Sequence, residues 1–332
     1  MGDLILVASP YATEAARGNS VSARRIAGIL QEVGYQPQHV EGTSDGTHEG
    51  VLMIALHARK SAPAIRAFKV AYPERPLVVL LTGTDLHADL FKRGKSRDTV
   101  LESMRQADRL VVCQEGSVRS IPENFLHKLV LVPKSVNVRI QEWKPATDRN
   151  PFQVILASHL RPAKDPLLIT EAVTELPDSS RIEVRHFGNS ESATLGKVAE
   201  ASSVRLGSRY QWKGAVARDI VMQELSTAHL ALNTSKVEGG ANALAEPQVM
   251  GVPCVATAIA ANKGMLGFDH PGLFPMGDSK ALAEMLWRAE SDPAFYRDLK
   301  EASRVRGPSF TREAERSAWN TVLVELLENW RA

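Results

Sequence analysis

Residues 236–257 read KVEGGANALAEPQVMGVPCVAT, a stretch in which Glu238 and Glu246 stand on either side of seven residues that begin Gly-Gly-Ala-Asn. The apolar run HLALNTS comes directly before it, and the run VPCVAT closes it. This order predicts a strand, a glycine-containing turn, a helix and a second strand. A strand–helix–strand unit of this kind favours a parallel β-sheet.

The same alternation continues in both directions along the chain. The apolar runs are LILVAS, VLMIALH, PLVVLLTG, RLVVCQ and KLVLVP in the first half, and FQVILAS, RIEVRHFG, YQWKGA, AHLALNTS and VPCVATAI in the second. Helical patterns separate most of them, and continuous apolar strands are typical of a sheet that is covered on both faces. The sequence therefore predicts an α/β protein with two doubly wound, Rossmann-like halves.

The polar stretch at 137–151 interrupts this alternation, so we place a domain boundary there. We predict an N-terminal domain at 1–148, a second domain at 149–308 and a final helix at 309–332. Doubly wound halves bind ligands at the carboxyl ends of their strands, which predicts a cleft between the two domains. The final helix has enough apolar surface to cross back and dock on the first domain; the alternative is a local helix on the second.

The composition is that of an ordinary soluble globular protein, with 44% hydrophobic and 23% charged residues. A formal net charge of +2 gives no overall field that would favour nucleic acid or an anionic membrane as a partner. The N-terminus has only a short apolar run and no basic leader, and no stretch approaches the ~18 apolar residues of a membrane span. We expect a cytoplasmic protein with Cys113 and Cys254 as buried, reduced thiols.

The turn that follows Glu238 has the features of a phosphate site. Its glycine pair lets backbone N–H groups approach a ligand without side chains in the way. The first N–H groups of the following helix have no internal partner and carry the positive end of the helix dipole. The residues expected to hold a diphosphate are Gly239, Gly240, Ala241 and Asn242. The alternative is a structural strand–turn–helix with carboxylates on its surface.

Four charged side chains accompany this turn. Glu238 is placed to accept hydrogen bonds from sugar hydroxyls, and Glu246 from ribose hydroxyls. Arg161 and Lys164 lie three residues apart in the loop ASHLRPAKDP, where two cations could neutralise a departing diphosphate without a metal ion. Alone, such a pair is usually solvated surface. The chain has no Asp-x-Asp and no His or Cys pair with metal-ligand spacing, so we expect neither a metal nor a cofactor.

In the first half, polar residues follow two of the predicted strands. Gly18 and Asn19, next to Arg17, precede a helix whose N-terminus offers another anion site; the alternative is a plain loop with an asparagine cap. His57 and Arg59 follow the strand VLMIALH and would point into the cleft if the sheet is parallel. A single histidine near a strand end is more often structural.

The spacing Glu-x7-Glu with Gly-Gly between, then Gly-x-Pro and a strand, resembles the donor-site signature of the retaining GT-B glycosyltransferases. The Arg161/Lys164 pair resembles the Arg/Lys pair of that family. In TGTDL, Thr84 and Asp85 resemble a Gly-Thr-Asp that lines the family's acceptor side, whereas a helix cap is the alternative for Asp85. Pro247 departs from the family, which more often has alanine there. Either the helix begins near Glu246 or its first turn is kinked, so the reach of Glu246 is in question.

A narrower resemblance covers nearly the whole chain, to the bacterial selenosugar synthases of selenoneine biosynthesis. The segments that carry it are RGNSVSARRIAGIL, ALHARKSAPAIRAF, LVVLLTGTDL, ADRLVVCQE, SHLRPAKDP, VEGGANALAE, GFDHPGLFPMGD and LWRAESDPAFY. The resemblance implies UDP-N-acetylglucosamine and selenophosphate as substrates, and a 1-seleno sugar, UDP and phosphate as products. It also implies that Arg161, Lys164, Glu238 and His57 form the catalytic set.

Selenophosphate needs no base to remove a proton, because its selenium is already anionic near neutral pH, whereas a hydroxyl acceptor does. We therefore expect His57 to orient a substrate, and Arg17, Asn19 and Arg59 to hold the acceptor's phosphoryl group, with Gly18 also in the acceptor site. Two alternatives are a glycosyltransferase that acts on a hydroxyl of a small molecule or lipid, and a catalytically silent protein that binds a nucleotide sugar. The sequence does not indicate the oligomeric state.

Overall fold

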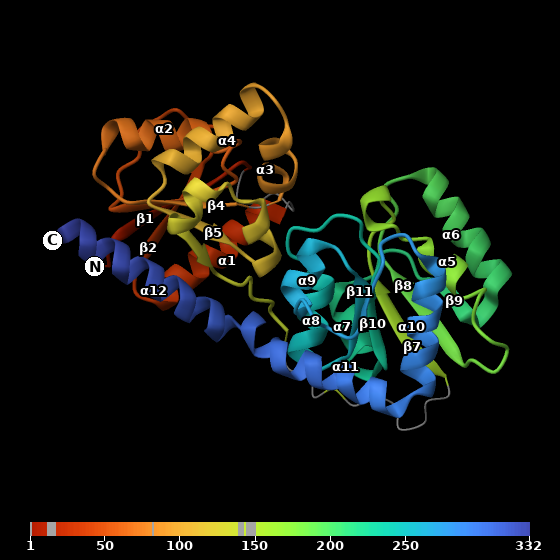
Figure 1. The fold of residues 1–332 in the computed structure, drawn as a ribbon. Helices are drawn as coiled ribbons and strands as arrows, with labels where there is room; N and C mark the ends of the chain where they lie inside the picture. The colour runs from red at the N-terminus through yellow and green to blue at the C-terminus, as the bar shows by residue number, and fades with distance from the viewer. Residues whose placement is uncertain (1, 12–17, 82, 139–142, 144–150) are drawn as a thin grey trace. The chain divides into compact units, whose positions relative to one another are not determined.

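The computed structural model describes residues 2–11, 18–81, 83–138, 143 and 151–332, and the chain divides into two compact units. The first unit contains Met1–Lys134 and Glu313–Ala332, and the second contains Ser135–Arg312. Each unit is built on one six-stranded parallel sheet with helices on both of its faces (Figure 1). The predicted pair of doubly wound, parallel-sheet halves is thereby confirmed.

The sheet of the first unit has the strand order β2-β1-β3-β4-β5-β6. Its strands are β1 (Leu4–Ser9), β2 (Gln36–Glu41), β3 (Leu52–Leu56), β4 (Leu77–Leu80), β5 (Arg109–Val112) and β6 (Leu129–Leu131). Its helices are α1 (Gly18–Glu32), α2 (Ala62–Ala71), α3 (Thr84–His87), α4 (Lys95–Gln106) and α12 (Arg312–Arg331). Short 3-10 turns are η1 (Asp89–Phe91), η2 (Glu115–Ser120) and η3 (Glu123–Lys128).

Successive side chains of each strand bury opposite faces of this sheet, because side chains alternate along a strand. Ile5 and Val7 of β1 belong to the core that α1 and α12 cover. Leu6 and Ala8 belong to the core that α2 and α4 cover. In Figure 1, α2 and α4 lie on one side of these strands, and α1 and α12 on the other.

The sheet of the second unit has the strand order β12-β11-β10-β7-β8-β9. Its strands are β7 (Phe152–Ala157), β8 (Ile182–Phe187), β9 (Tyr210–Trp212), β10 (Leu230–Asn233), β11 (Cys254–Thr257) and β12 (Leu273–Phe274). Its helices are α5 (Leu168–Ala172), α6 (Ala193–Leu206), α7 (Arg218–Thr227), α8 (Asn242–Met250), α9 (Ala260–Leu266), α10 (Ser279–Ser291) and α11 (Pro293–Arg306). Strands β7 and β10 are neighbours, and the strands that follow each of them are added outward in opposite directions. The carboxyl ends of β7 and β10 are therefore the switch point of the sheet.

Helix α12 belongs to the first unit although it follows the second in the chain. Trp319, Leu323 and Leu327 lie in the same buried core as Ile5 and the residues of α1. Helices α1 and α12 are also joined by a charged pair, in which Arg25 Nε donates to both oxygens of Glu315 at 3.1 and 2.9 Å. Burial of both the apolar stripe and the ion pair fixes α12 on this face.

The division between the units differs from the predicted boundaries, because it falls after Lys134 and Arg312 instead of after 148 and 308. The backbone N–H of Val136 donates to the carbonyl of Phe310 at 3.0 Å, and both side chains belong to one core of the second unit. Residues 135–138 and 309–312 are therefore part of the second unit. In the described ranges, no helix is long and apolar enough to cross a membrane.

We predict that Glu315→Ala lowers the free energy of unfolding by about 3–5 kcal/mol, because it removes the carboxylate that pairs with the largely buried Arg25 guanidinium. The side chain of Glu315 is only 1% exposed and that of Arg25 14%. Urea denaturation followed by tryptophan fluorescence measures the loss. Glu313→Ala is the matched control, since Glu313 is 84% exposed and 3.9 Å from Arg316, and it should change stability by less than about 0.5 kcal/mol. Equal effects of the two substitutions would contradict the prediction.

Candidate functional site

The loop that follows β7 is anchored to β8 by a buried histidine. His186 Nε2 lies 2.8 Å from the carbonyl oxygen of Ser158, and Nδ1 lies 2.9 Å from the hydroxyl of Tyr210. Burial lowers the pKa of His186 to about 4, so its imidazole is neutral at neutral pH. A carbonyl can only accept, so Nε2 carries the proton and Nδ1 accepts from Tyr210. Gly188 lets the strands approach, because a Cβ on it would stand 2.0 Å from the Ser158 oxygen.

Lys164 and Glu238 meet at the switch point of the second unit. Lys164 ends the short turn η4 (Pro162–Lys164), and its Nζ lies 2.5 Å from Oε1 of Glu238. The side chain of Glu238 is only 7% exposed and that of Lys164 20%, so the pair is largely shielded from water. The two residues that the sequence assigns to cation and carboxylate roles are thus in direct contact. The same Oε1 also accepts hydrogen bonds from Ser235 Oγ and Asn233 Nδ2.

Arg161 does not join this pair in the structure. Its Nε lies 3.6 Å from Oε1 of Glu191, and both side chains are about half exposed. The structure therefore brings together Lys164 and Glu238 and leaves Arg161 with a different carboxylate. A role of Arg161 toward a diphosphate stays a prediction.

The glycine turn leads directly into α8, which begins at Asn242. Its N-cap is Ala241, which supplies no side-chain hydrogen bond to the first turn, and Asn242 itself is exposed. The N–H of Ala241 donates to Sδ of Met265 and that of Leu244 to the carbonyl of Ala241, each at 3.0 Å. The N–H groups of Asn242 and Ala243, at the positive end of the helix, are therefore the ones that suit a phosphate. Neither Gly239 nor Gly240 is among the glycines with positive φ in the described ranges. At these two positions glycine supplies the absence of a side chain and not a left-handed backbone.

The start of α8 settles one question about Pro247. The helix runs from Asn242 to Met250 with Pro247 inside it, so the idea that the helix begins near Glu246 is wrong. Glu246 lies one turn into the helix and is buried, and its Oε1 accepts from Nε and Nη2 of Arg218 at 3.0 and 2.7 Å. Arg218 opens α7, and sequence reasoning missed it because no spacing pattern links it to Glu246. Each of the two glutamates thus has one oxygen held by a cation.

His57 lies in the first unit, directly after β3, and its backbone has the unusual φ of +72°. A positive φ strains a residue with a side chain, so the surrounding contacts must hold it. The N–H of His57 donates to the carbonyl of Leu80 at 2.9 Å, and the backbone N–H of Lys60 donates to Nδ1 at 3.4 Å. Because Nδ1 accepts, the proton of the neutral ring is on Nε2, which lies 2.8 Å from Oγ1 of Thr84.

Asp85 is fully buried and holds this loop through hydrogen bonds. Its two oxygens accept from the backbone N–H groups of Ala58, Gly83 and Leu86 at 2.9, 3.0 and 3.1 Å. Oδ2 also lies 3.7 Å from Nδ1 of His57. Because Asp85 is buried, it cannot contact the predicted acceptor substrate in this conformation. Any influence of Asp85 on a ligand therefore passes through His57 and the loop. Thr84 joins this cluster through the contact of its hydroxyl with the His57 ring.

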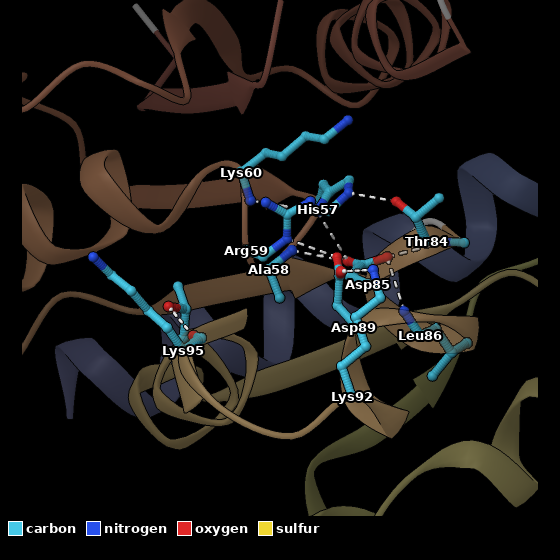
Figure 2. A network of polar contacts seen from close by, with 12 residues as sticks. His57, Ala58, Arg59, Lys60, Thr84, Asp85, Leu86, Asp89, Lys92 and Lys95 are labelled. Atoms are coloured by element: carbon cyan, nitrogen blue, oxygen red, sulfur yellow. Dashed lines mark hydrogen bonds and ion pairs between the residues drawn. The ribbon is translucent and has the colours of Figure 1, made fainter. Parts of the chain in front are cut away.

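Figure 2 shows this cluster, in which the His57 ring points to Thr84 and Arg59 to Asp89, while Lys60 and Lys95 extend away. Arg59 Nε donates to Oδ2 of Asp89 at 2.7 Å, and Lys92 lies 3.4 Å from the other oxygen. Burial alone would raise the pKa of Asp89, but its hydrogen bonds and charge contacts with Arg59 and Lys92 lower it. Asp89 is therefore a carboxylate at neutral pH and fixes the Arg59 guanidinium.

Burial also lowers the pKa of His57, and the charges of Lys60 and Arg59 lower it further against the opposing charge of Asp85. His57 is therefore neutral at neutral pH, and its only ring proton faces Thr84. Lys60 Nζ extends to the hydroxyl of Tyr11 at 2.7 Å. Cations and a neutral donor thus gather at the carboxyl end of β3.

The remaining predicted residues are at the start of α1. Gly18 and Asn19 are the first two residues of that helix, and Asn19 is half-buried. Arg17 lies outside the described residues. Of the four residues predicted to be catalytic, His57 belongs to the first unit, and Arg161, Lys164 and Glu238 belong to the second. Within the described ranges, no group of three or more His, Cys, Asp or Glu side chains is arranged to hold a metal ion.

The family model of the Glycosyl transferases group 1 matches residues 137–306, which is more than half of the 332-residue chain. This range contains Arg161, Lys164, Glu238, Glu246 and the glycine turn between the glutamates. No curated protein sequence matches the chain.

Solved structures of low sequence identity share the fold over nearly the whole chain. A glycosyltransferase from Rickettsia africae is 14% identical with a TM-score of 0.79, and the match covers 99% of each chain. HepE of Anabaena, solved with UDP and glucose, is 16% identical with a TM-score of 0.72, over 97% of this chain and all of HepE. Sucrose-phosphate synthase from Thermosynechococcus elongatus is 15% identical with a TM-score of 0.75, over 99% of this chain. These likenesses show a shared GT-B fold.

We predict that Lys164→Met weakens the binding of inorganic pyrophosphate by about tenfold or more, as measured by calorimetry. The substitution removes a charge-assisted donor and leaves the Glu238 charge uncompensated beside the helix N-terminus. Lys236→Met is the control, because Lys236 lies in a neighbouring loop and pairs with Asp165 at 3.0 Å. The control should bind pyrophosphate nearly as well as wild type. Equal weakening by both variants would mean that only the general positive charge of the region matters.

Proposed function

The chain belongs to the group 1 glycosyl transferases, and we propose that it transfers N-acetylglucosamine from UDP-N-acetylglucosamine to selenophosphate. The products are 1-seleno-N-acetylglucosamine, UDP and phosphate. The bond between C1 and the UDP oxygen breaks, UDP leaves with the electron pair, and selenium forms the new bond to C1. One water molecule then cleaves the Se–P bond, and its oxygen leaves with the phosphate.

The observation that carries the donor half is the Lys164–Glu238 pair beside the uncapped N-terminus of α8. The helix N–H groups and Lys164 suit the diphosphate, where negative charge develops as the bond to C1 breaks. The carboxylates of Glu238 and Glu246 suit the hydroxyls of a sugar and a ribose. HepE, which shares the fold, was solved with UDP-glucose, and this supports UDP as the nucleotide.

The acceptor half of the proposal is supported by the cluster after β3. Arg59 and Lys60 supply positive charge next to a neutral His57. The proton of that ring is on Nε2 and faces Thr84, an arrangement that suits donation of a hydrogen bond better than removal of a proton. An acceptor that is already anionic fits such a site, since it requires charge neutralisation and no base. The resemblance of the chain to selenosugar synthases supplies the identity of the nucleophile.

We also propose that the reaction needs no metal ion, because the helix N-terminus and Lys164 can neutralise the departing diphosphate. A cytoplasmic location would fit the proposed substrates.

The test is mass spectrometry of the products formed from UDP-N-acetylglucosamine with selenophosphate, run with and without a chelator. Parallel reactions contain thiophosphate, phosphate, a thiol or glycerol in place of selenophosphate, and UDP-glucose in place of the donor. We expect the seleno sugar and UDP in equal amounts, with no loss of rate in the chelator. Release of UDP only with glycerol would indicate a hydroxyl acceptor, and binding without any turnover would indicate a silent nucleotide-sugar-binding protein. Either result would refute the proposal.

We expect His57→Asn to reduce turnover of selenophosphate by about 10- to 100-fold, because the ring orients a substrate and does not act as an obligatory base. Asparagine is the suitable replacement, since it tolerates the positive φ of this position better than alanine does. His127→Asn, at an exposed position of η3, is the control and should be fully active. Less than about a thousandth of the rate in His57→Asn would contradict the milder role.

A further inference from the structure

The two oxygens of Glu238 have different surroundings. Oε1 accepts from Lys164 Nζ at 2.5 Å, Ser235 Oγ at 2.7 Å and Asn233 Nδ2 at 3.3 Å. Oε2 accepts no hydrogen bond from the described part of the chain, and it is not one of the sealed, unpartnered atoms found there. Oε2 is therefore the oxygen that a ligand hydroxyl can reach. The direction in which Oε2 points depends on the groups that hold Oε1.

Ser235 and Asn233 are in turn held by a fully buried polar chain that begins on another helix. Asn262 of α9 donates from Nδ2 to the hydroxyl of Thr257 at 2.9 Å, and more distantly to Oδ1 of Asn233 at 3.4 Å. The Thr257 hydroxyl donates to the carbonyl of Ser235 at 2.5 Å, and Asn233 Oδ1 accepts the backbone N–H of Ser235 at 3.0 Å. Hydrogen bonds in such a chain polarise and strengthen one another in a low-dielectric interior.

The groups that Asn262 contacts do not depend on it for satisfaction. The carbonyl of Thr257, which accepts from Asn262 at 3.1 Å, also accepts the N–H of Ile259 at 2.8 Å. Thr257 Oγ1 and Asn233 Oδ1 each keep another hydrogen bond. Meanwhile Oδ1 of Asn262 is itself buried with no partner among the described residues, an arrangement that lowers stability. An apolar side chain of similar size would therefore be tolerated by the fold at this position.

We propose that Asn262 is a positioning residue for sugar recognition: through Thr257, Ser235 and Asn233 it orients Glu238 so that Oε2 faces the sugar of the donor. The inference rests on the proposed function, since it assigns Glu238 to the sugar. It adds a residue on α9 whose side chain is sealed from solvent and contacts no substrate. Asn262 is separated in sequence from the loop that it controls.

The experiment is a double-substitution cycle measured by equilibrium binding. Dissociation constants for UDP and for UDP-N-acetylglucosamine are determined by calorimetry on the wild-type chain, Asn262→Leu, Glu238→Gln and the double variant. The dissociation constant for UDP divided by that for UDP-N-acetylglucosamine reports the contribution of the sugar alone. We expect Asn262→Leu to reduce this ratio by about tenfold in the wild-type background and by less than about twofold in the Glu238→Gln background. Its affinity for UDP should stay within about twofold of wild type.

The chain supplies a matched control in Gln248 of α8. Among the residues that the structure describes, Oε1 of this buried amide also has no partner, and its Nε2 donates only to the carbonyl of Leu244. Gln248→Leu repeats the chemical change outside the polar chain and should leave the ratio unchanged. Both leucine variants should melt within about 3 °C of wild type, because neither leaves a side-chain partner without another hydrogen bond.

Three results would overturn the inference. One is an equal loss in both backgrounds, which would mean that Asn262 does not act through Glu238. Another is a parallel loss of affinity for UDP, or the same loss in Gln248→Leu, which would indicate a general structural effect. The third is an Asn262→Leu ratio equal to that of wild type, and this would leave the donor assignment intact. A wild-type chain that binds UDP-N-acetylglucosamine no better than UDP would contradict the sugar-binding role of Glu238 itself, and with it the proposed function.

Discussion

The contact between Lys164 and Glu238 is the interaction on which the site in the second unit depends. It joins the loop after β7 to the loop after β10, and these strands are neighbours at the switch point of the sheet. A carboxylate with 7% exposure needs such a partner, because an unpaired charge in that position would be strongly destabilising. The oxygen that Lys164 holds also accepts from Ser235 and Asn233, so the pair is continuous with the buried hydrogen-bond chain.

Buried carboxylates are held in two different ways in this protein. Asp85 in the first unit accepts mainly from backbone N–H groups and so determines the conformation of the loop that carries His57. Glu238 and Glu246 in the second unit accept from the side chains of Lys164 and Arg218. The first arrangement fixes a strained backbone, and the second fixes charged side chains. The surrounding donors, and not the residue type, decide which of the two tasks a carboxylate performs.

Much of the fold follows from the sequence, because continuous apolar runs separated by amphipathic segments permit few arrangements other than covered parallel sheets. The Lys164–Glu238 region could also be predicted, since both residues follow strands that end at one edge. Side-chain partners could not. Arg218 pairs with Glu246 and Arg161 pairs with Glu191, and nothing in the spacing of these residues along the sequence indicates either pair. Asp85 follows a strand, as other residues predicted to bind the acceptor do, but its side chain is buried and accepts from backbone N–H groups. This orientation depends on the path of the chain.

The place of α12 has a consequence for the way the protein is made. The face formed by Ile5, Val7 and α1 is covered by residues 313–332, which leave the ribosome only after all of 135–312. The second unit is continuous in the chain and can complete its core as soon as it emerges. The first unit must wait with an apolar face open to water. Nascent-chain folding should therefore finish in the reverse of the order in which the two units are translated, and chaperone contacts should concentrate on the half that is synthesised first.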